Sequence, residues 1–229
     1  YMIDIGQGDC TLIVEPFQRS TVMIDCGQSL YKDNMELYVV PFLRSIHVNH
    51  LDCLILTHDD FDHSGGYESL SQQIEIKECI RDSKTEIPVP YPFLSLCPER
   101  EAKDENDKSI VSLFEYDGIR YLWMGDASTD VEKQIIKEYP TLKTDILKLG
   151  HHGSKTSSSF KFLDEVNPLI GLISVGKHNH YGHPDSIVIQ NCAKLQIHVL
   201  MTKDVGMVEL SSFYGIHWMQ SASGLFGLF

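Results

Sequence analysis

The stretch that decides the fold is His58-Asp59-Asp60-Phe61-Asp62-His63, which directly follows the mostly apolar residues 51–56 and Thr57. An apolar run of this length that ends in polar residues predicts a buried strand followed by a loop. The pattern His-x-Asp-x-Asp-His within this stretch offers four potential metal ligands, two imidazoles and two carboxylates. A tight loop after a strand can turn successive side chains toward one point, so the segment predicts one edge of a site for two metal ions. The alternative is a solvated acidic loop.

Polar residues also follow several other apolar runs. In chain order they are Asp25, Asp126, His151, His152 and His183. Because ligand sites in open α/β sheets lie at the carboxyl ends of strands, we expect these side chains to gather beside the 58–63 loop. Any one of them alone fits equally well as a capping or hydrogen-bonded loop residue, whereas the joint pattern favours a shared site.

The remaining pattern predicts two β-rich halves, each followed by helices, within a single domain over 1–229. We expect strands at 2–5, 11–14, 21–24, 51–56, 110–115, 119–124, 145–149, 169–175, 198–201, 207–210 and 216–219. We expect helices at 31–46 (interrupted by Pro41), 67–73, 128–139 (capped by Ser128), 159–166 and 184–195. The pair Asp117-Gly118 between apolar runs predicts a hairpin. Residues 82–108 contain four prolines and many charges, which favours an irregular insertion that forms a mobile rim.

Composition limits the partners and the compartment. The 229 residues carry 19 Lys and Arg against 32 Asp and Glu, a net charge of −13 that disfavours tight nonspecific binding of polyanions. The six cysteines include no Cys-x-x-Cys pair, so we expect reduced, mostly buried thiols. The sequence contains no apolar stretch long enough to span a membrane. These features predict a soluble, cytoplasmic chain, unless it is part of a longer membrane protein.

The sequence resembles the metallo-β-lactamase superfamily, and specifically the β-lactamase-like domain of ComEC-type DNA-internalisation proteins and their stand-alone relatives. The resemblance covers nearly the whole chain. Its motifs lie at residues 4–10 (containing Gly-Gln-Gly-Asp), 23–27, 56–66, 124–126, 147–154 (containing His-His-Gly-Ser) and 174–184. The resemblance implies an α/β (α+β) fold, a four-layer αββα sandwich.

The resemblance also implies a ligand set. By position, His58 and Asp60 would bind the first metal, Asp62 and His63 the second, Asp126 would bridge both, and His183 would complete the second site. The superfamily loop is His-x-His-x-Asp-His, so Asp60 stands in place of a histidine. Residues 64–125 contain no His, so the first site lacks one family ligand and is either weaker or completed by water or another group.

A site of three His and three Asp without thiolate suits two divalent ions, either Zn²⁺ or Mn²⁺. We expect a metal-activated hydroxide to attack a phosphoester, with Asp62, His151 and His152 as catalytic residues. His151 and His152 would contact phosphate or protonate the leaving group. Lys148 and Ser154 would assist, although Lys148 fits equally well as a surface residue. Asp25 would support a ligand histidine.

The substrate is less well specified than the chemistry. The resemblance implies a nuclease or phosphodiesterase acting on DNA, or a small-molecule phosphoesterase of the phosphorylcholine esterase type. A thioester or lactam hydrolase is disfavoured only by family analogy. The competing hypothesis from another class is a noncatalytic, metal-stabilised module in a larger assembly, with the 82–108 rim recognising a protein partner.

Overall fold

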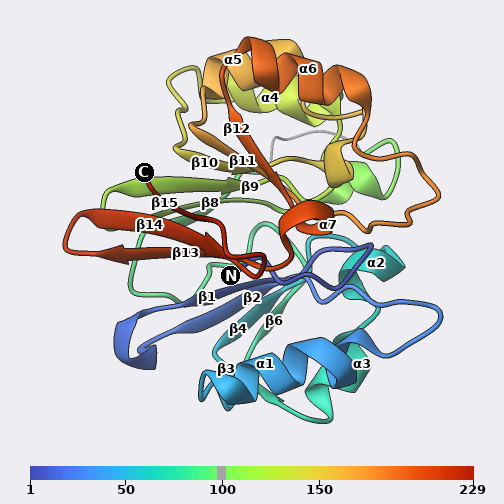
Figure 1. The fold of residues 1–229 in the computed structure, drawn as a ribbon, viewed down its shortest axis with the longest axis vertical. Helices are drawn as coiled ribbons and strands as arrows, with labels where there is room; N and C mark the ends of the chain where they lie inside the picture. The colour runs from blue at the N-terminus through green and yellow to red at the C-terminus, as the bar shows by residue number, and fades with distance from the viewer. Residues whose placement is uncertain (97–101) are drawn as a thin grey trace.

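Two β-sheets lie face to face with helices on both outer sides (Figure 1). This computed structural model describes residues 1–96 and 102–229. The layer order confirms the predicted αββα sandwich. Among the described residues, no helix combines the length and the apolar character needed to cross a membrane.

The first sheet contains the strand that leads into the metal-ligand loop. Its strands occur in the order β1-β2-β4-β6, and β13-β14-β15 lie beside them. Their bounds are β1 (Thr11–Val14), β2 (Thr21–Ile24), β4 (Cys53–Ile55), β6 (Cys79–Ile80), β13 (Val208–Phe213), β14 (Ile216–Ser221) and β15 (Phe226–Leu228). A separate pair is formed by β3 (His50–Leu51) and β5 (Glu75–Ile76). Because β2 and β4 are parallel, their carboxyl ends meet at one edge.

The second sheet has the order β12-β11-β10-β9-β8-β7. Its strands are β12 (His198–Met201), β11 (Ile170–Ile173), β10 (Ile146–Lys148), β9 (Ile119–Trp123), β8 (Val111–Tyr116) and β7 (Phe93–Leu96). The strands β9 to β12 are parallel to one another. The carboxyl ends of β9 and β10 therefore lie at the same edge.

Helices cover the outer faces and carry some of the loops. They are α1 (Val40–Ser45), α2 (Phe61–Ser64), α3 (Tyr67–Ser71), α4 (Thr129–Glu138), α5 (Phe160–Val166), α6 (Ser186–Lys194) and α7 (Thr202–Val205), together with the short helices η1 (Pro16–Gln18), η2 (Met35–Val39), η3 (Asn106–Lys108) and η4 (His151–Gly153). In Figure 1, α4, α5 and α6 cover the second sheet, and α1 and α3 cover the first.

Three apolar clusters separate the four layers. One lies under α4–α6 and includes Phe162, and one lies under α1 and includes Leu43. The third lies between the sheets and is rich in aromatic side chains, with Phe114 and Tyr121 stacked at a ring-centroid distance of 4.8 Å. Burial of apolar area in these clusters, at about 25 cal/mol per Å², is the main force that holds the sheets together.

Several local predictions are confirmed. The hairpin turn at Asp117-Gly118 has positive φ at both residues, as a tight two-residue turn requires. The hydroxyl of Ser128 accepts a hydrogen bond from the backbone N–H of Asp130 at the start of α4. The described cysteines are free thiols, four of them buried; Cys97 lies outside the described residues.

Other local predictions are wrong. Residues 2–5 form no strand, and only Met2 makes isolated bridges. The helix predicted for 31–46 is shorter and changes type beside Pro41: the π-helical η2 ends at Val39, and Pro41 lies in the first turn of α1, where a missing N–H costs little. The 82–108 insertion is not wholly irregular, since β7 pairs with β8 at the edge of the second sheet. Residues 97–101 of that insertion lie outside the described residues.

A buried carboxyl group makes stability depend on pH. Glu132 in α4 is 1% exposed, and its carboxyl accepts hydrogen bonds from the backbone N–H groups of Ser158 and Ser159. Burial outweighs these bonds and raises its pKa from 4.5 to about 7. The folded protein therefore retains a proton here that the unfolded chain loses. This stabilising contribution is complete below pH 4.5 and is lost as the pH rises through 7.

We predict that Glu132→Gln removes this pH dependence. Between pH 4.5 and pH 8 the wild type should lose up to roughly 3 kcal/mol of unfolding free energy relative to the variant, because only the wild type has the carboxyl group that must ionise. Urea unfolding at several pH values measures it. Glu138→Gln, at an exposed position of α4, is the control. Parallel pH profiles for Glu132→Gln and wild type would contradict the prediction.

Candidate metal centre

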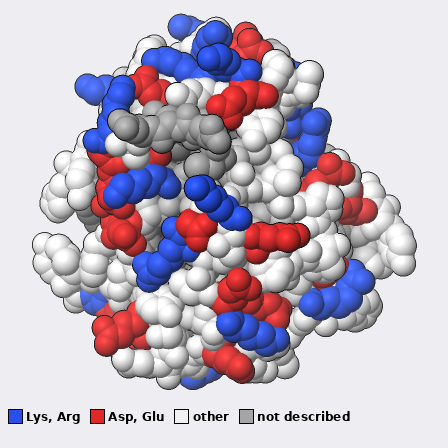
Figure 2. Space-filling view, turned by 180° about the vertical axis from the view of Figure 1, so that it is seen from behind, with Lys and Arg blue, Asp and Glu red and all other residues white. Residues whose placement is uncertain are grey.

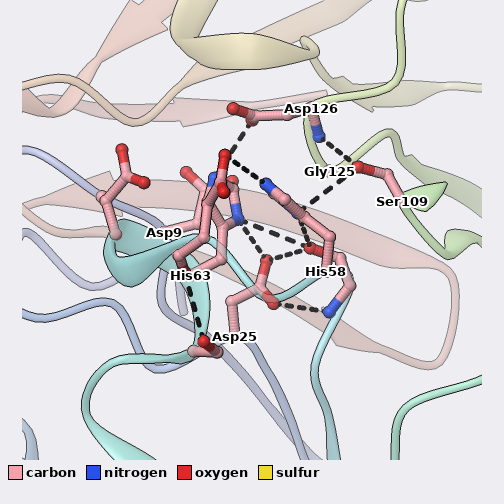
Figure 3. Close-up of polar contacts among 12 residues, drawn as sticks. Asp9, Asp25, His58, His63, Ser109, Gly125 and Asp126 are labelled. Atoms are coloured by element: carbon pink, nitrogen blue, oxygen red, sulfur yellow. Dashed lines mark hydrogen bonds and ion pairs between the residues drawn. The ribbon is translucent and has the colours of Figure 1, made fainter. Parts of the chain in front are cut away.

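Polar residues gather where β2, β4, β9 and β10 end (Figure 3). Asp25 follows β2, His58 follows β4, and Asp126 follows β9. The pair His151-His152 follows β10 as part of η4. His63 lies in α2, which begins at the end of the loop. The predicted convergence of distant segments is thus present in the tertiary structure.

One group consists of His58, His63 and Asp126, which offer ligand atoms within 4.8 Å of one another. The Nε2 of His63 lies 3.1 Å from Oδ1 of Asp126, and the rings of His58 and His63 are 4.1 Å apart. These Nε2 atoms and Oδ1 of Asp126 are buried without an aligned hydrogen-bond partner. A buried polar atom without a partner costs about 1–3 kcal/mol. The donor set and its unsatisfied atoms therefore fit a cation bound at their centre.

Hydrogen bonds behind the rings hold these imidazoles in place. Oδ2 of Asp25 lies 2.8 Å from Nδ1 of His63, and the backbone N–H of Thr57 donates to the same carboxylate at 2.8 Å. The hydroxyl of Thr57 lies 3.0 Å from Nδ1 of His58. Because Nδ1 of each ring has a partner, Nε2 is directed toward Asp126. The supporting role assigned to Asp25 is compatible with this position and stays a prediction.

A second group consists of Asp62, His63 and His152. The Nδ1 of His152 lies 2.9 Å from the carbonyl oxygen of Ser174, so that nitrogen carries the proton. Its Nε2 faces Oδ2 of Asp62 at 3.2 Å. His151 and His152 both have left-handed backbone, which is uncommon for residues other than glycine and is often found at functional sites. The geometry thus places His152 among the groups able to bind a metal, a role that the sequence analysis did not assign to it.

Asp60 and His183 lie farther out. The Asp60 side chain is 48% exposed, and its Oδ2 is 3.5 Å from Nε2 of His58. The ring of His183 is half-buried, 5.6 Å from that of His151 and stacked on Tyr181. Within the described parts of the chain, neither residue belongs to the groups whose ligand atoms converge. Their assignments as ligands remain predictions.

His151 and Ser154 meet at Thr156. The Nδ1 of His151 lies 3.1 Å from the hydroxyl of Thr156, which lies 2.9 Å from that of Ser154. This leaves Nε2 of His151 directed toward Oδ2 of Asp126, at 3.7 Å. His151 therefore lies beside the centre, with one ring nitrogen available.

The buried pair of Lys148 and Asp9 lies beneath the centre. Lys148 is only 1% exposed and forms an ion pair with Asp9, so the surface alternative for Lys148 is wrong. Asp9 also lies 3.5 Å from Nδ1 of His152. The sequence analysis quoted Asp9 within the Gly-Gln-Gly-Asp motif but assigned it no role. Only the contact with Lys148, 139 residues away, reveals one.

Opposite charges keep the carboxylates ionised. Burial raises the pKa of Asp126, but the charges of His63 and His152 outweigh this effect and hold it well below its usual value. Burial likewise raises the pKa of Asp62, and a hydrogen bond from His152 together with the charges of His63 and His152 brings it to about 2. Both groups are therefore carboxylates at neutral pH, the form that binds metal ions.

Comparison with known proteins agrees with this geometry. The sequence profile of the metallo-beta-lactamase superfamily matches residues 3–96, which include the whole loop that ends at His63. The chain has the metallo-β-lactamase fold. A solved metallo-beta-lactamase fold protein, YhfI from Bacillus subtilis, superposes with a TM-score of 0.60 at 12% identity, over 90% of this chain and 97% of that one.

Curated relatives include proteins named for the ComE operon and for recombination. ComE operon protein 3 of Bacillus subtilis is 31% identical over 91% of this chain and 32% of its own length. Recombination protein 2 of Haemophilus influenzae is 30% identical over 92% of this chain and 28% of its own length. The chain thus spans about a third of the length of these curated relatives, in agreement with the resemblance to ComEC-type proteins.

We predict that Asp126→Ala weakens metal binding by at least about 100-fold, because groups that merely support ligands already contribute 10–100-fold. Titration of the metal-free protein with Mn²⁺ or Zn²⁺, followed by elemental analysis and by the rise in Tm, measures the change. His198→Ala, an exposed histidine outside the centre, is the control. Equal metal content in Asp126→Ala and wild type would rule out this centre.

We also predict that Lys148→Met destabilises the fold by about 3–5 kcal/mol, because it leaves the buried carboxylate of Asp9 without its cation. Urea unfolding in the presence of a chelator measures the change without a contribution from bound metal. Lys133→Met, which removes an exposed ion pair with Asp130, should cost about 0–1 kcal/mol. Adding Asp9→Asn to Lys148→Met should recover part of the loss. A double variant no more stable than Lys148→Met would contradict the pairing.

Proposed function

We propose that this chain is a metal-dependent hydrolase of phosphodiesters. Metallo-β-lactamase proteins are typically metal-dependent hydrolases, and the fold is present here. The observation that carries the proposal is the set of buried ligand atoms on His58, His63 and Asp126, which lie within 4.8 Å of one another and make no hydrogen bond of good geometry. A scaffold role alone gives no reason for three buried ligand atoms to converge without well-aligned hydrogen bonds.

We assign His58, His63 and Asp126 to one ion, and Asp62 with His152 to a second ion beside it. Asp60 and His183 stay proposed as further ligands from the periphery. Divalent ions in such a centre, Zn²⁺ or Mn²⁺, lower the pKa of bound water toward about 7 and neutralise charge on phosphoryl oxygens.

The chain's own residues would orient the substrate and move protons. His151 has a partner at Nδ1 and a free Nε2, and burial lowers its pKa below the usual value, so the ring is neutral at pH 7. We assign it to contact with the phosphate and to proton transfer, in which its neutral Nε2 would take up a proton from the attacking water and pass that proton to the leaving oxygen. Lys148 and Asp25 would act indirectly: Lys148 forms an ion pair with Asp9, and Asp25 holds the ring of His63 in position through Nδ1.

Charge distribution favours a small phosphodiester, or a short stretch of nucleic acid held at the centre, over extended DNA. The net charge is −13. On the face shown in Figure 2, basic and acidic side chains are interspersed. Phosphate contacts by clustered Lys and Arg usually dominate nonspecific DNA affinity. The names of two relatives concern competence and recombination. If the substrate of this chain is DNA, the DNA must contact residues outside the face shown in Figure 2.

We predict that Asp62→Ala lowers kcat/KM for bis(p-nitrophenyl) phosphate by about 100-fold or more, since it removes a carboxylate from the second group. The assay uses wild type and variant loaded with Mn²⁺ or with Zn²⁺. Asp164→Ala, at an exposed position of α5, should leave the rate unchanged. No hydrolysis by metal-loaded wild type, or equal rates for wild type and Asp62→Ala, would reject phosphodiester hydrolysis and favour the noncatalytic module.

A further inference from the structure

The loop between β11 and α6, residues 174–185, is braced by the side chain of Asn179. Its amide nitrogen donates hydrogen bonds to the carbonyl oxygens of Gly176 at 3.1 Å and His183 at 2.9 Å. Its amide oxygen accepts a hydrogen bond from the backbone N–H of His183 at 2.9 Å. The N–H of Gly176 also donates to the side chain of Gln7 at 3.3 Å. The loop is therefore preorganised, so a ligand that binds to it pays little for ordering it.

A row of rings leads outward from the candidate metal centre along this loop. Nε2 of His151 lies 3.7 Å from Oδ2 of Asp126, and the ring of His183 is 5.6 Å from that of His151. The ring of Tyr181 comes next, 5.9 Å from that of His183 and inclined to it by only 12°. Tyr181 is 71% exposed. In Figure 1 the loop, drawn in orange, projects on the same side of the molecule as α2, which carries His63. The row therefore ends in an aromatic ring that solvent reaches.

Packing within the chain does not account for the position of this ring. Among the described residues, the three apolar clusters do not include Tyr181, and its ring contact is with His183. An isolated exposed aromatic residue is ordinary at a protein surface. This one, however, stacks on a ring of a braced loop that leads to candidate metal ligands. A flat ligand could cover its exposed area and recover the free energy of burying apolar surface.

The charge of the loop favours an anionic ligand beside Tyr181. Residues 166–184 contain no Asp or Glu, although the whole chain carries a net charge of −13. The exposed side chains of the loop include Lys177, His178 and His180. A phosphodiester that approaches along this loop therefore meets a cation and neutral polar groups instead of carboxylates, which lowers the electrostatic cost of its binding.

A quaternary ammonium group, such as that of a choline ester, fits this loop less well. Proteins usually hold such cations in a cage of several aromatic rings. Tyr181 is the one Phe, Tyr or Trp in residues 174–185, and the neighbouring Lys177 would repel a cation. The loop therefore suits stacking between two flat rings better than enclosure of an ammonium group.

We propose that Tyr181 is a specificity-determining residue, whose exposed ring stacks on an aromatic ring of the size of a nucleobase carried by the phosphodiester. This inference rests on the proposed function, because it takes the phosphate to lie at the metal centre beside His151. The group esterified to that phosphate would then extend along His183 and reach Tyr181. Stacking needs no base-specific hydrogen bond, so purine and pyrimidine esters should bind with similar affinity.

Calorimetric titration of the metal-loaded protein with thymidine 5′-phosphate tests the stacking without any turnover. Methyl phosphate is titrated in parallel, since it offers the same phosphate without a ring. We expect Tyr181→Ala to weaken binding of thymidine 5′-phosphate by about tenfold or more and to change binding of methyl phosphate by less than about twofold. Tyr181→Phe and Tyr181→Trp should keep the affinity, because both retain a stacking face. Tyr214→Ala, which removes an 88% exposed tyrosine from the β13–β14 turn, is the matched control.

Three results would overturn the proposal. The first is no binding of thymidine 5′-phosphate by the wild type, or equal affinities of the wild type and Tyr181→Ala. The second is an equal loss of affinity for both phosphates, because the substitution would then act on the metal centre. The third is tighter binding of phosphorylcholine than of thymidine 5′-phosphate that depends on Tyr181, because the ring would then hold an ammonium group.

The binding result is distinct from the hydrolysis result. Binding that depends on Tyr181, together with no hydrolysis of bis(p-nitrophenyl) phosphate, would reject the proposed function and leave the stacking in place. Hydrolysis of that ester, together with binding that does not depend on Tyr181, would reject the stacking alone.

Discussion

The structure depends on charge compensation among buried carboxylates at the strand ends. Asp9, Asp25 and Asp126 are all buried, within a few ångströms of His63 or Lys148. A buried carboxylate without a positive partner is strongly unfavourable, so each of these groups is tolerable only because the others are placed around it. Lys148 neutralises Asp9 from below, while His63 lies between Asp25 and Asp126. The buried ligand atoms of His58, His63 and Asp126 that make no well-aligned hydrogen bond lie close together, where a divalent cation would complete the charge balance.

The two-sheet architecture explains why this arrangement is possible. In each sheet the loops that follow parallel strands lie at the same edge. Residues from five distant parts of the chain therefore meet there without long connecting loops. The aromatic cluster between the sheets fixes the distance between Asp126, on the second sheet, and His63, on the first. Rigidity far from the centre therefore sets the separation of its ligand atoms.

Local pattern was sufficient for much of the fold. Alternation and apolar runs located β1, β2 and the β8–β9 hairpin, and hydroxyl chemistry located the cap of α4, because these features depend on residues close in sequence. Short edge strands such as β5, β6 and β7 escaped prediction. Their pairing depends on partners elsewhere in the chain, and their sequences are too short to show the alternation of apolar and polar residues that marks a strand.

The sequence by itself determined which residue types follow which strands, and hence that a cluster of imidazoles and carboxylates forms at one edge of an αββα sandwich. Only the tertiary structure decided that His152 faces Asp62, that Asp60 and His183 lie at the periphery, and that Lys148 is buried against Asp9. Those outcomes depend on side-chain directions across distances of 90 residues or more along the chain. Local sequence determines the backbone path of each loop. Which nitrogen of a histidine ring remains available depends on a distant oxygen that binds the other nitrogen, as the carbonyl oxygen of Ser174 binds Nδ1 of His152.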